Sequence, residues 1–435
     1  MPNQPFPSYE AHFDQSGSFL GADSTLDIAA LTKATDLFVM SHGWNNDENQ
    51  ARSLYDGFFA SVGSLIDDKT LTIPQGRDFR CLRIFWPSKQ FDLPNSNAAV
   101  AAGAGDPALA AAVLQTQRLI DATADPSAKA ALTTALGLLG TINTDASAAD
   151  QFVRLVLSTA TSDAEEHDPV SSVFEQSAQM RGGDMLDALG RVPTPPPTID
   201  TVAADAGQEN VAAFGITNLL GGAVNFLNLF TYKTMKERAG IVGTVGVAPL
   251  LAKIRAQCPT LRIHLVGHSF GGRLVTSVAN AFPGNDWGHR VSSMLLLQAA
   301  FSQFGFAKNY LATGKDGAFR GTLLRDCVVG EIAITHTTND KANGSAYPLA
   351  SRLFNQVASA VGDATDLYGA IGCNGAQDTP EAVQDVLGEA GNAYAALPAA
   401  SAIRNLRADK YISSHGDVEG RQVAYVALRN ALASA

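Results

Sequence analysis

The sequence predicts an α/β fold, in which a doubly wound, mostly parallel sheet carries an inserted helical cap. Short apolar runs that suit buried parallel strands alternate with stretches of helical periodicity. A long alanine-rich region separates the second of these strand-like runs from the third. The core therefore comprises residues 1–94 and 236–435, and the helical cap comprises residues 95–235.

The first part of the core has the order strand, helix, strand. An apolar run over 37–40 ends in a loop, and a second apolar run over 81–86 ends at Pro87. Between them, apolar residues recur at helical spacing from 54 to 66. This order is typical of a parallel sheet, because a helix must carry the chain back to the start of the next strand.

The second part of the core repeats this alternation. We expect a helix over 248–257 and three strands over 261–266, 293–297 and around 332–335. A closing amphipathic helix is marked by Val423, Val426, Ala427 and Leu428. No internal repeat is found.

The inserted region has a different character from the core. β-Branched runs are scarce in it, and the proline-rich stretch 192–197 predicts a stiff internal hinge. Residues 211–232 are long and apolar, but three asparagines and a pair of glycines argue against a membrane span. Two interpretations stay open for this segment: a buried cap helix, or one wall of an apolar acyl pocket that touches a lipid surface.

Composition excludes several classes of function. A net charge of −11 provides no basic surface for nucleic acid. Four separated cysteines form no CxxC pair, so neither a zinc site nor a dense disulfide framework is expected, and Cys81 and Cys327 suit a protein core. The first residues lack the apolar region of a secretory signal, which makes a cytoplasmic location the default expectation; leaderless export leaves no mark of this kind.

A glycine-rich motif carries the predicted chemistry. Residues 267–272 read GHSFGG and fit G-x-S-x-G, the turn that exposes a nucleophilic serine between a strand and a helix. An apolar strand ends just before the motif, and a helical stripe of apolar residues follows it. We therefore predict Ser269 as a nucleophile, and a glycine-rich turn with an idle serine is the alternative. No HExxH, Walker or dinucleotide motif is present, so we expect no cofactor and no metal.

With these motifs the chain resembles the α/β-hydrolase family, especially its esterase and lipase-like members. The HGWN-type loop reads SHGWNN over 41–46, and a strand ending in WPS reads FWPS over 85–88. The resemblance covers 1–94 and 236–435. It implies an oxyanion hole formed by the backbone N–H groups of Trp44 and Phe270, with His42 in a structural role.

The order of the triad in this fold is serine, acid, histidine. Asp340 follows the predicted strand at 332–335 and is the predicted acid; Glu331, Asp326, Asp363 and Asp366 are rivals. His415 is the only histidine that follows Asp340, so chain order selects it as the base. We expect His264 and His268 to pack or to support the site, and we assign no role to His12, His167, His289 and His336.

The predicted activity is hydrolysis of a carboxylic ester through an acyl-Ser269 intermediate, in which His415 accepts the serine proton and Asp340 orients the imidazole. The expected substrate is a small-molecule or lipid ester with an apolar acyl chain. We expect no transmembrane segment, and transient contact with a lipid surface at most. The sequence specifies no oligomeric state. An amidase, a thioesterase and an exported phospholipase would use the same triad, and a catalytically silent binding module is the alternative of another class.

Overall fold

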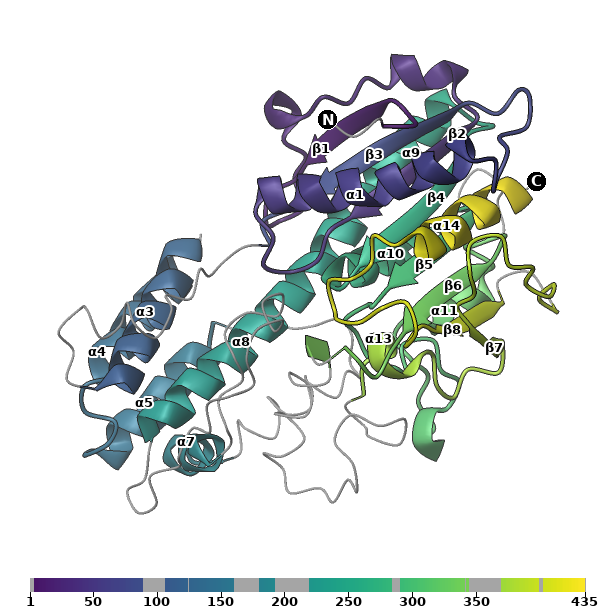
Figure 1. Cartoon of the computed structure of the whole chain (residues 1–435). Helices are drawn as coiled ribbons and strands as arrows, with labels where there is room; N and C mark the ends of the chain where they lie inside the picture. Colours follow the sequence, from purple (N-terminus) through teal and green to yellow (C-terminus); the bar gives the residue numbers. More distant parts are fainter. Residues whose placement is uncertain are drawn as a thin grey trace. The chain divides into compact units, whose positions relative to one another are not determined.

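The computed structural model describes residues 4–88, 106–123, 125–159, 180–191, 219–283, 290–340, 342–343, 369–398 and 402–434. The chain divides into two compact units (Figure 1). Unit 1 comprises Met1–Ser88, Lys236–Gly344 and Gly362–Ala435, and unit 2 comprises Lys89–Met235 and Ser345–Val361. The predicted hinge at 192–197 and the first part of the apolar segment, 211–218, lie outside the described residues.

Unit 1 is built on a parallel sheet. Its described strands have the spatial order β1-β3-β2-β4-β5-β6-β8-β7, and every pair of neighbours is parallel. The strands are β1 (Ser8–His12), β2 (Asp36–Ser41), β3 (Phe79–Phe85), β4 (Arg262–His268), β5 (Ser293–Leu297), β6 (Ile332–His336), β7 (Ala382–Val386) and β8 (Ile403–Arg407). The direction of winding reverses between β2 and β4, and in open α/β sheets ligands bind outside the carboxyl ends of the strands at such a point.

Helices cover both faces of this sheet. The α-helices of unit 1 are α1 (Glu48–Asp67), α9 (Ala248–Gln257), α10 (Phe270–Ala281), α11 (Arg320–Leu324), α13 (Ile371–Asn374) and α14 (Arg421–Ala433). Shorter 3-10 turns are η1 (Gly21–Asp23), η2 (Ala29–Lys33) and η5 (Tyr310–Ala312), and η3 (Val242–Val247) is a π-helix. α1 begins at a capping box between Asp47 and Gln50, which satisfies backbone N–H groups of its first turn.

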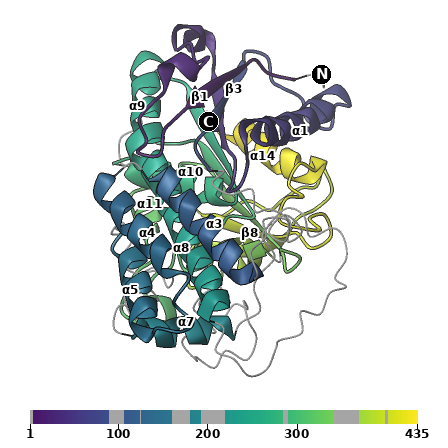
Figure 2. The same ribbon diagram turned by 90° about the vertical axis from the view of Figure 1, so that its left-hand side faces the viewer.

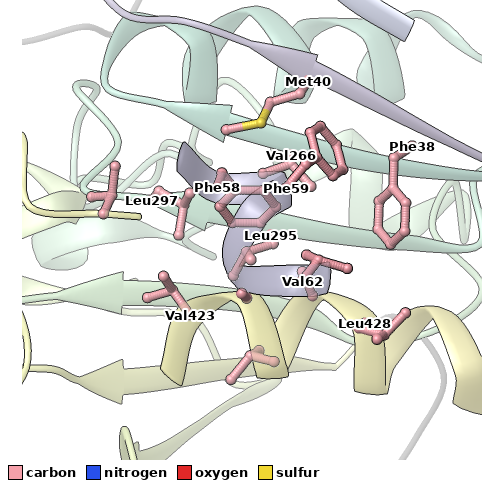
Figure 3. Packing of buried hydrophobic residues seen from close by; sticks show 14 of the residues in the cluster. Phe38, Met40, Phe58, Phe59, Val62, Val266, Leu295, Leu297, Val423 and Leu428 are labelled. Carbon is pink, nitrogen blue, oxygen red and sulfur yellow. The ribbon is translucent and has the colours of Figure 1, made fainter. Parts of the chain in front are cut away.

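The main described core lies between the sheet and the pair α1 and α14. Alternate residues of a strand face opposite sides, so Phe38 and Met40 of β2 point to the same side as Leu295 and Leu297 of β5. Figure 3 shows these side chains meeting Phe58, Phe59 and Val62 of α1 and Val423 and Leu428 of α14. α10 packs with α9 and η3 on the opposite face of the sheet. Gly267 shows this: it points to the face opposite Val266, and it lies against Gly271 of α10.

The five strands predicted from apolar runs are confirmed, and so are the helices over 54–66, 248–257 and the closing helix. β1, β7 and β8 were not predicted. β1 and β7 lie at the two edges of the sheet and read SYEAH and AVQDV, with polar residues among the apolar ones. β8 contains Arg404, which is buried and paired with Glu331 and Asp385, so its sequence lacks the apolar run of a buried strand.

The regular elements in the described part of unit 2 are all helices (Figure 2). Its helices are α3 (Pro107–Ala122), α4 (Pro126–Leu138), α5 (Ala146–Leu157), α7 (Gly182–Gly190) and the first part of α8 (Leu219–Ile241). Asp106, Asp125 and Asp145 cap α3, α4 and α5 by accepting backbone N–H bonds of the first turn. Inside the unit, the ring of Phe226 on α8 lies 6.1 Å from that of Phe152 on α5.

The described part of the apolar segment is thus a buried helix, and it extends beyond its predicted end at 232. α8, η3 and α9 form one continuous helical segment over Leu219–Gln257. By length and composition this segment, found among the described residues, is apolar enough to cross a membrane, and half of its most apolar window is buried within the protein. A long core helix meets the same criteria, so this feature is weak evidence for a span.

Candidate functional site

Ser269 occupies a tight turn between β4 and α10. Its backbone has φ 56° and ψ −124°, a conformation that residues with a side chain rarely adopt. Three backbone hydrogen bonds maintain it: Ser269 N–H donates to Leu297 O at 3.0 Å, and Ser269 O accepts from Gly272 N–H at 2.9 Å and from Ala300 N–H at 3.0 Å. The neighbouring strand and the helix therefore hold the strained turn in place.

The glycines of the motif are required by close packing. A Cβ atom added to Gly267 would lie 2.4 Å from Gly271 O, and one added to Gly271 would lie 2.2 Å from Ser41 O. A Cβ on Gly272 would lie 2.5 Å from the Cβ of Ala299. None of these positions accommodates a side chain, so the glycine pattern reflects how tightly α10 returns onto β2, β4 and the loop after β5.

The loop after β2 lies directly beside the serine. In the sheet register Ser41 is opposite Gly267, so the two loops leave the sheet side by side. A Cβ on Gly43 would lie 2.5 Å from Ser269 Cβ and 3.1 Å from its Oγ. The rings of Trp44 and Phe270, the two predicted oxyanion residues, have centroids 5.9 Å apart. The absence of a side chain at Gly43 therefore lets this backbone approach the serine.

His42 anchors this loop from behind. Its Nδ1 lies 2.9 Å from Gly43 O, and its backbone N–H donates to Tyr55 Oη at 2.9 Å. Its ring stacks on Trp86, whose indole N–H donates to His42 O at 3.1 Å. Burial lowers the pKa of His42 to about 4, so the ring is neutral and its Nδ1–H can donate to the Gly43 carbonyl.

Asp340 and His415 form a buried pair. Asp340 lies four residues beyond β6, His415 lies in the loop between β8 and α14, and His415 Nδ1 is 2.9 Å from Asp340 Oδ2. Burial acts to raise the pKa of Asp340, but attraction to His415 and its hydrogen bonds outweigh burial and hold the pKa below the ordinary value. The acid is therefore ionised and oriented toward the imidazole.

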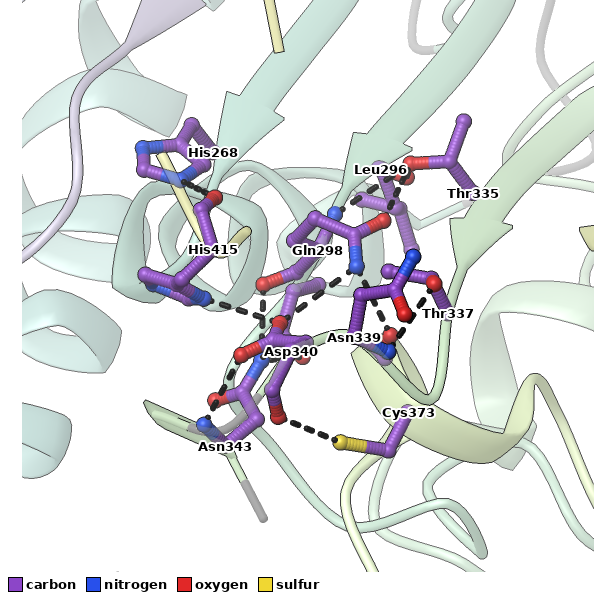
Figure 4. A network of polar contacts seen from close by, with 12 residues as sticks. His268, Leu296, Gln298, Thr335, Thr337, Asn339, Asp340, Asn343, Cys373 and His415 are labelled. Carbon is purple, nitrogen blue, oxygen red and sulfur yellow. Dashed lines mark hydrogen bonds and ion pairs between the residues drawn. The ribbon is translucent and has the colours of Figure 1, made fainter. Parts of the chain in front are cut away.

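Two amide side chains support the acid (Figure 4). Asn343 donates to both carboxylate oxygens of Asp340, from its backbone N–H at 3.0 Å and from Nδ2 at 2.9 Å. Gln298 follows β5 at φ 45°, and its Nε2 lies 3.4 Å from Asp340 Oδ2. Thr335 donates to Gln298 Oε1 at 2.9 Å and so fixes the orientation of that amide. The carboxylate is fully engaged by donors, as a buried charge requires.

His268 connects the serine turn to the histidine loop. Its Nε2 lies 3.0 Å from His415 O, and the centroids of the two rings are 4.9 Å apart. Among the described residues, no hydrogen bond joins Ser269 Oγ to His415. The structure thus pairs Asp340 with His415 and places Gly43 against Ser269. The hydrogen bond of His268 to His415 O links the turn that carries Ser269 to the Asp340–His415 pair.

The rival residues have other partners or lie elsewhere. Glu331 binds Arg404 and Arg429, and Asp326 sits at the end of a turn with φ 49°. His264 lies between Asp36 and Ser293, His336 Nδ1 is 3.3 Å from Cys373 O, and His12 pairs with Glu10 and Glu48. Asp363, Asp366, His167 and His289 lie outside the described residues.

Sequence reasoning missed Gln298 and Asn343 as supporting residues. A usable signal existed: Gln298 is the first residue after a predicted strand, where the carboxyl ends of parallel strands gather, and Asn343 is three residues from Asp340. In the described part of the chain, no group of three or more His, Cys, Asp or Glu side chains could hold a metal ion.

Comparison of the chain with models of protein families, with curated proteins and with solved structures finds no match. The α/β fold therefore comes from the strand order, and any function must be argued from the site.

Proposed function

We propose that this chain is a serine hydrolase of the α/β-hydrolase type that cleaves carboxylic esters. One observation carries the proposal: Ser269 sits on a strained strand-to-helix turn, at the same edge of the sheet as a buried Asp340–His415 pair. Loops that follow β2, β4, β6 and β8 supply the proposed groups. Such an arrangement of nucleophile, base and acid is recognised by geometry and roles rather than by sequence position.

The proposed reaction proceeds in two stages. Ser269 Oγ attacks the ester carbonyl carbon while its proton passes to His415 Nε2, the nitrogen not bonded to Asp340. The bond to the alcohol then breaks, and the same proton passes from His415 to the leaving oxygen. In the second stage water attacks the acyl-serine by the same transfers and releases the acid. The serine–histidine bond is expected to form when substrate binds, since such bonds are often long in free enzymes.

The oxyanion of each tetrahedral intermediate is proposed to bind the N–H groups of Trp44 and Phe270. The C=O and N–H of a trans peptide point in opposite directions, so holding Gly43 O at the ring of His42 directs Trp44 N–H away from that ring. Phe270 is the first residue of α10, where backbone N–H groups leave the helix end and the dipole favours negative charge. Phe270 directly follows Ser269, and Gly43, which precedes Trp44, packs against Ser269; both facts support this assignment.

A fluorophosphonate probe tests the proposal. We expect labelling of the native protein at Ser269, and no labelling or ester cleavage after Ser269→Ala. Ser277→Ala is the matched control, because Ser277 is also buried and lies two turns further along α10; this variant should label normally. Labelling that survives Ser269→Ala would overturn the nucleophile.

The substrate class needs a second measurement. A series of p-nitrophenyl esters of rising chain length, assayed beside amides, thioesters and phospholipids, separates an esterase from an amidase, a thioesterase and a phospholipase. A native protein that neither reacts with the probe nor cleaves any of these substrates would favour the silent binding module.

A further inference from the structure

His268 has the contacts of a residue that does more than fill space. It is buried, it directly precedes Ser269, and its Nε2 lies 3.0 Å from the backbone carbonyl of His415. A carbonyl oxygen can only accept, so Nε2 carries the proton and donates. One hydrogen bond therefore links the residue before the proposed nucleophile to the main chain of the proposed base (Figure 4).

The ring of His268 is neutral in this setting. Burial is the main cause that lowers its pKa to about 3, and the nearby His415 lowers it further. With Nε2–H donating, Nδ1 keeps a lone pair, and this buried atom has no hydrogen-bond partner among the described residues. An apolar ring would pack here without that unpaired acceptor, so packing alone does not account for a histidine.

Other hydrogen bonds of the loop around His415 lie within the loop or join it to the segment after β6. Asp417 Oδ2 accepts from the backbone N–H and the hydroxyl of Ser413, at 3.0 and 2.7 Å. Asn339 Nδ2 donates to Ile412 O at 2.9 Å, which ties the start of the loop to the segment after β6. These bonds fix the loop's shape and its distance from Asp340, whereas the His268 bond sets its distance from β4 and from Ser269.

We propose that His268 is a positioning residue, which holds the main chain of His415 so that its imidazole can reach Ser269 Oγ. The inference rests on the proposed hydrolase function. Asp340 orients the ring of His415 at Nδ1, and His268 fixes the backbone that carries the ring. Two attachments leave the imidazole little freedom to move away from the serine, and a displacement of about 1 Å at a reacting group can cost on the order of 100-fold in rate.

Two variants test this role. In His268→Gln the amide nitrogen lies about as far along the side chain as Nε2 and can still donate to His415 O. His268→Leu fills similar space without a donor. We expect the Leu variant to lose about 10- to 100-fold in kcat with little change in KM. The Gln variant should recover most of that loss, and rates of fluorophosphonate labelling should follow the same order.

Thermal unfolding of each variant monitors folding. If the Leu variant does not fold, His268→Asn replaces it, because its amide is one methylene too short to reach His415 O. Full activity in the Leu or Asn variant would overturn the positioning role, and so would an equal loss in a folded Gln variant.

Failure of the proposed function would look different, since the native protein itself would then be neither labelled nor active. In that case amide hydrogen exchange of the loop around His415 decides the positioning role. Exchange should stay at the native rate in the Gln variant and become faster in the Leu variant; an unchanged rate in the Leu variant would refute the role.

Discussion

At the scale of single residues, Asp340 illustrates how the site manages a buried charge. Its carboxylate receives donors from His415, Asn343 and Gln298, and these bonds outweigh the cost of burial. An acid of this kind stays ionised without help from solvent and keeps the proton of His415 on Nδ1. The other imidazole nitrogen, Nε2, is then the one that can accept a proton.

Replacing Asp340 by Asn should therefore cost much of the activity. The amide removes the charge that stabilises an imidazolium and can hold the wrong tautomer, and the serine-protease precedent for this change is about 10⁴-fold in kcat. We expect a loss of about 10²- to 10⁴-fold, measured as kcat on a p-nitrophenyl ester. Glu331→Gln is the control, because Glu331 is a largely buried carboxylate bound to Arg404 instead of a histidine. Normal turnover in Asp340→Asn together with a dead Glu331→Gln would reassign the acid.

Residue types alone do not make a site, as a second cluster in unit 1 demonstrates. Asp36, His264 and Ser293 are linked at 3.0 and 2.9 Å, but they are buried near the amino ends of the strands. Arg77 binds both oxygens of Asp36 at 2.6 Å and also donates to Ala431 O of α14. This cluster joins β2, β4, β5 and the last helix, so we assign it to stability.

The stability of the Asp36 cluster should depend on pH. Burial acts to raise the pKa of Asp36, but hydrogen bonds from His264, Arg77 and Thr35 lower it from 3.8 to about 2. A carboxyl whose pKa is lower in the folded than in the unfolded state stabilises the fold at pH values above its unfolded pKa. That stabilisation disappears as the pH falls toward the folded pKa of about 2. Asp36→Asn should thus lose about 2 kcal/mol of unfolding free energy at pH 7, and the difference from wild type should shrink between pH 4 and 2.

Denaturant unfolding at several pH values measures this difference. Asp78→Asn serves as the control, because Asp78 is adjacent to the same strands but half-exposed, and its effect should stay within about 0.5 kcal/mol. A gap between Asp36→Asn and wild type that is equally wide at pH 7 and pH 2 would show that the carboxylate charge does not stabilise the cluster.

At the scale of elements, sequence patterns identified the apolar strands that are buried on both faces of the sheet. They missed a strand whose buried charge is paired with residues of other segments. β2 to β6 are apolar runs, and their ends fell within two residues of the predictions. β8 escaped because its buried Arg404 is neutralised by Glu331 and Asp385, which lie on other segments. Chain order could select His415. The position of Gln298 just after a predicted strand could have marked it as a candidate, but its support of Asp340 became clear only once β5 and β6 were known to be neighbours.

The close packing of the loop after β2 requires glycine at position 43, and this requirement can be tested. An added Cβ at Gly43 would sit 2.5 Å from Ser269 Cβ, so Gly43→Ala must displace either the loop or the serine. If the loop supplies an oxyanion donor, we expect about 10²-fold lower kcat, comparable to the loss of one such donor. Gly137→Ala in α4 is the control, since its added methyl group meets no atom within 4 Å. Unchanged kcat in a folded Gly43→Ala variant would exclude this loop from the oxyanion hole.

At the scale of the whole molecule, the chain contains two compact units, each with buried aromatic residues of its own. The interior of unit 1 includes Phe59 of α1, and that of unit 2 includes Phe226 of α8 packed against Phe152. All the proposed catalytic groups belong to unit 1. If unit 2 is the cap that selects long acyl chains, cleavage of short esters requires an intact unit 1, and cleavage of long esters requires both units.

Matched truncations in the two interiors separate these requirements. Phe226 and Phe59 are each about 1% exposed or less, and removing such a ring costs about 3–5 kcal/mol. Phe226→Ala should lower the unfolding temperature of unit 2 alone. At temperatures between the two transitions the protein should then still label at Ser269 and cleave acetate esters, but it should no longer cleave long-chain esters. Phe59→Ala should remove labelling and both activities together, because it unfolds the sheet that holds Ser269, Asp340 and His415. Both variants could instead lower the temperature of a single calorimetric transition equally and lose labelling in parallel. The two units would then unfold together, and selectivity for long acyl chains could not be assigned to unit 2.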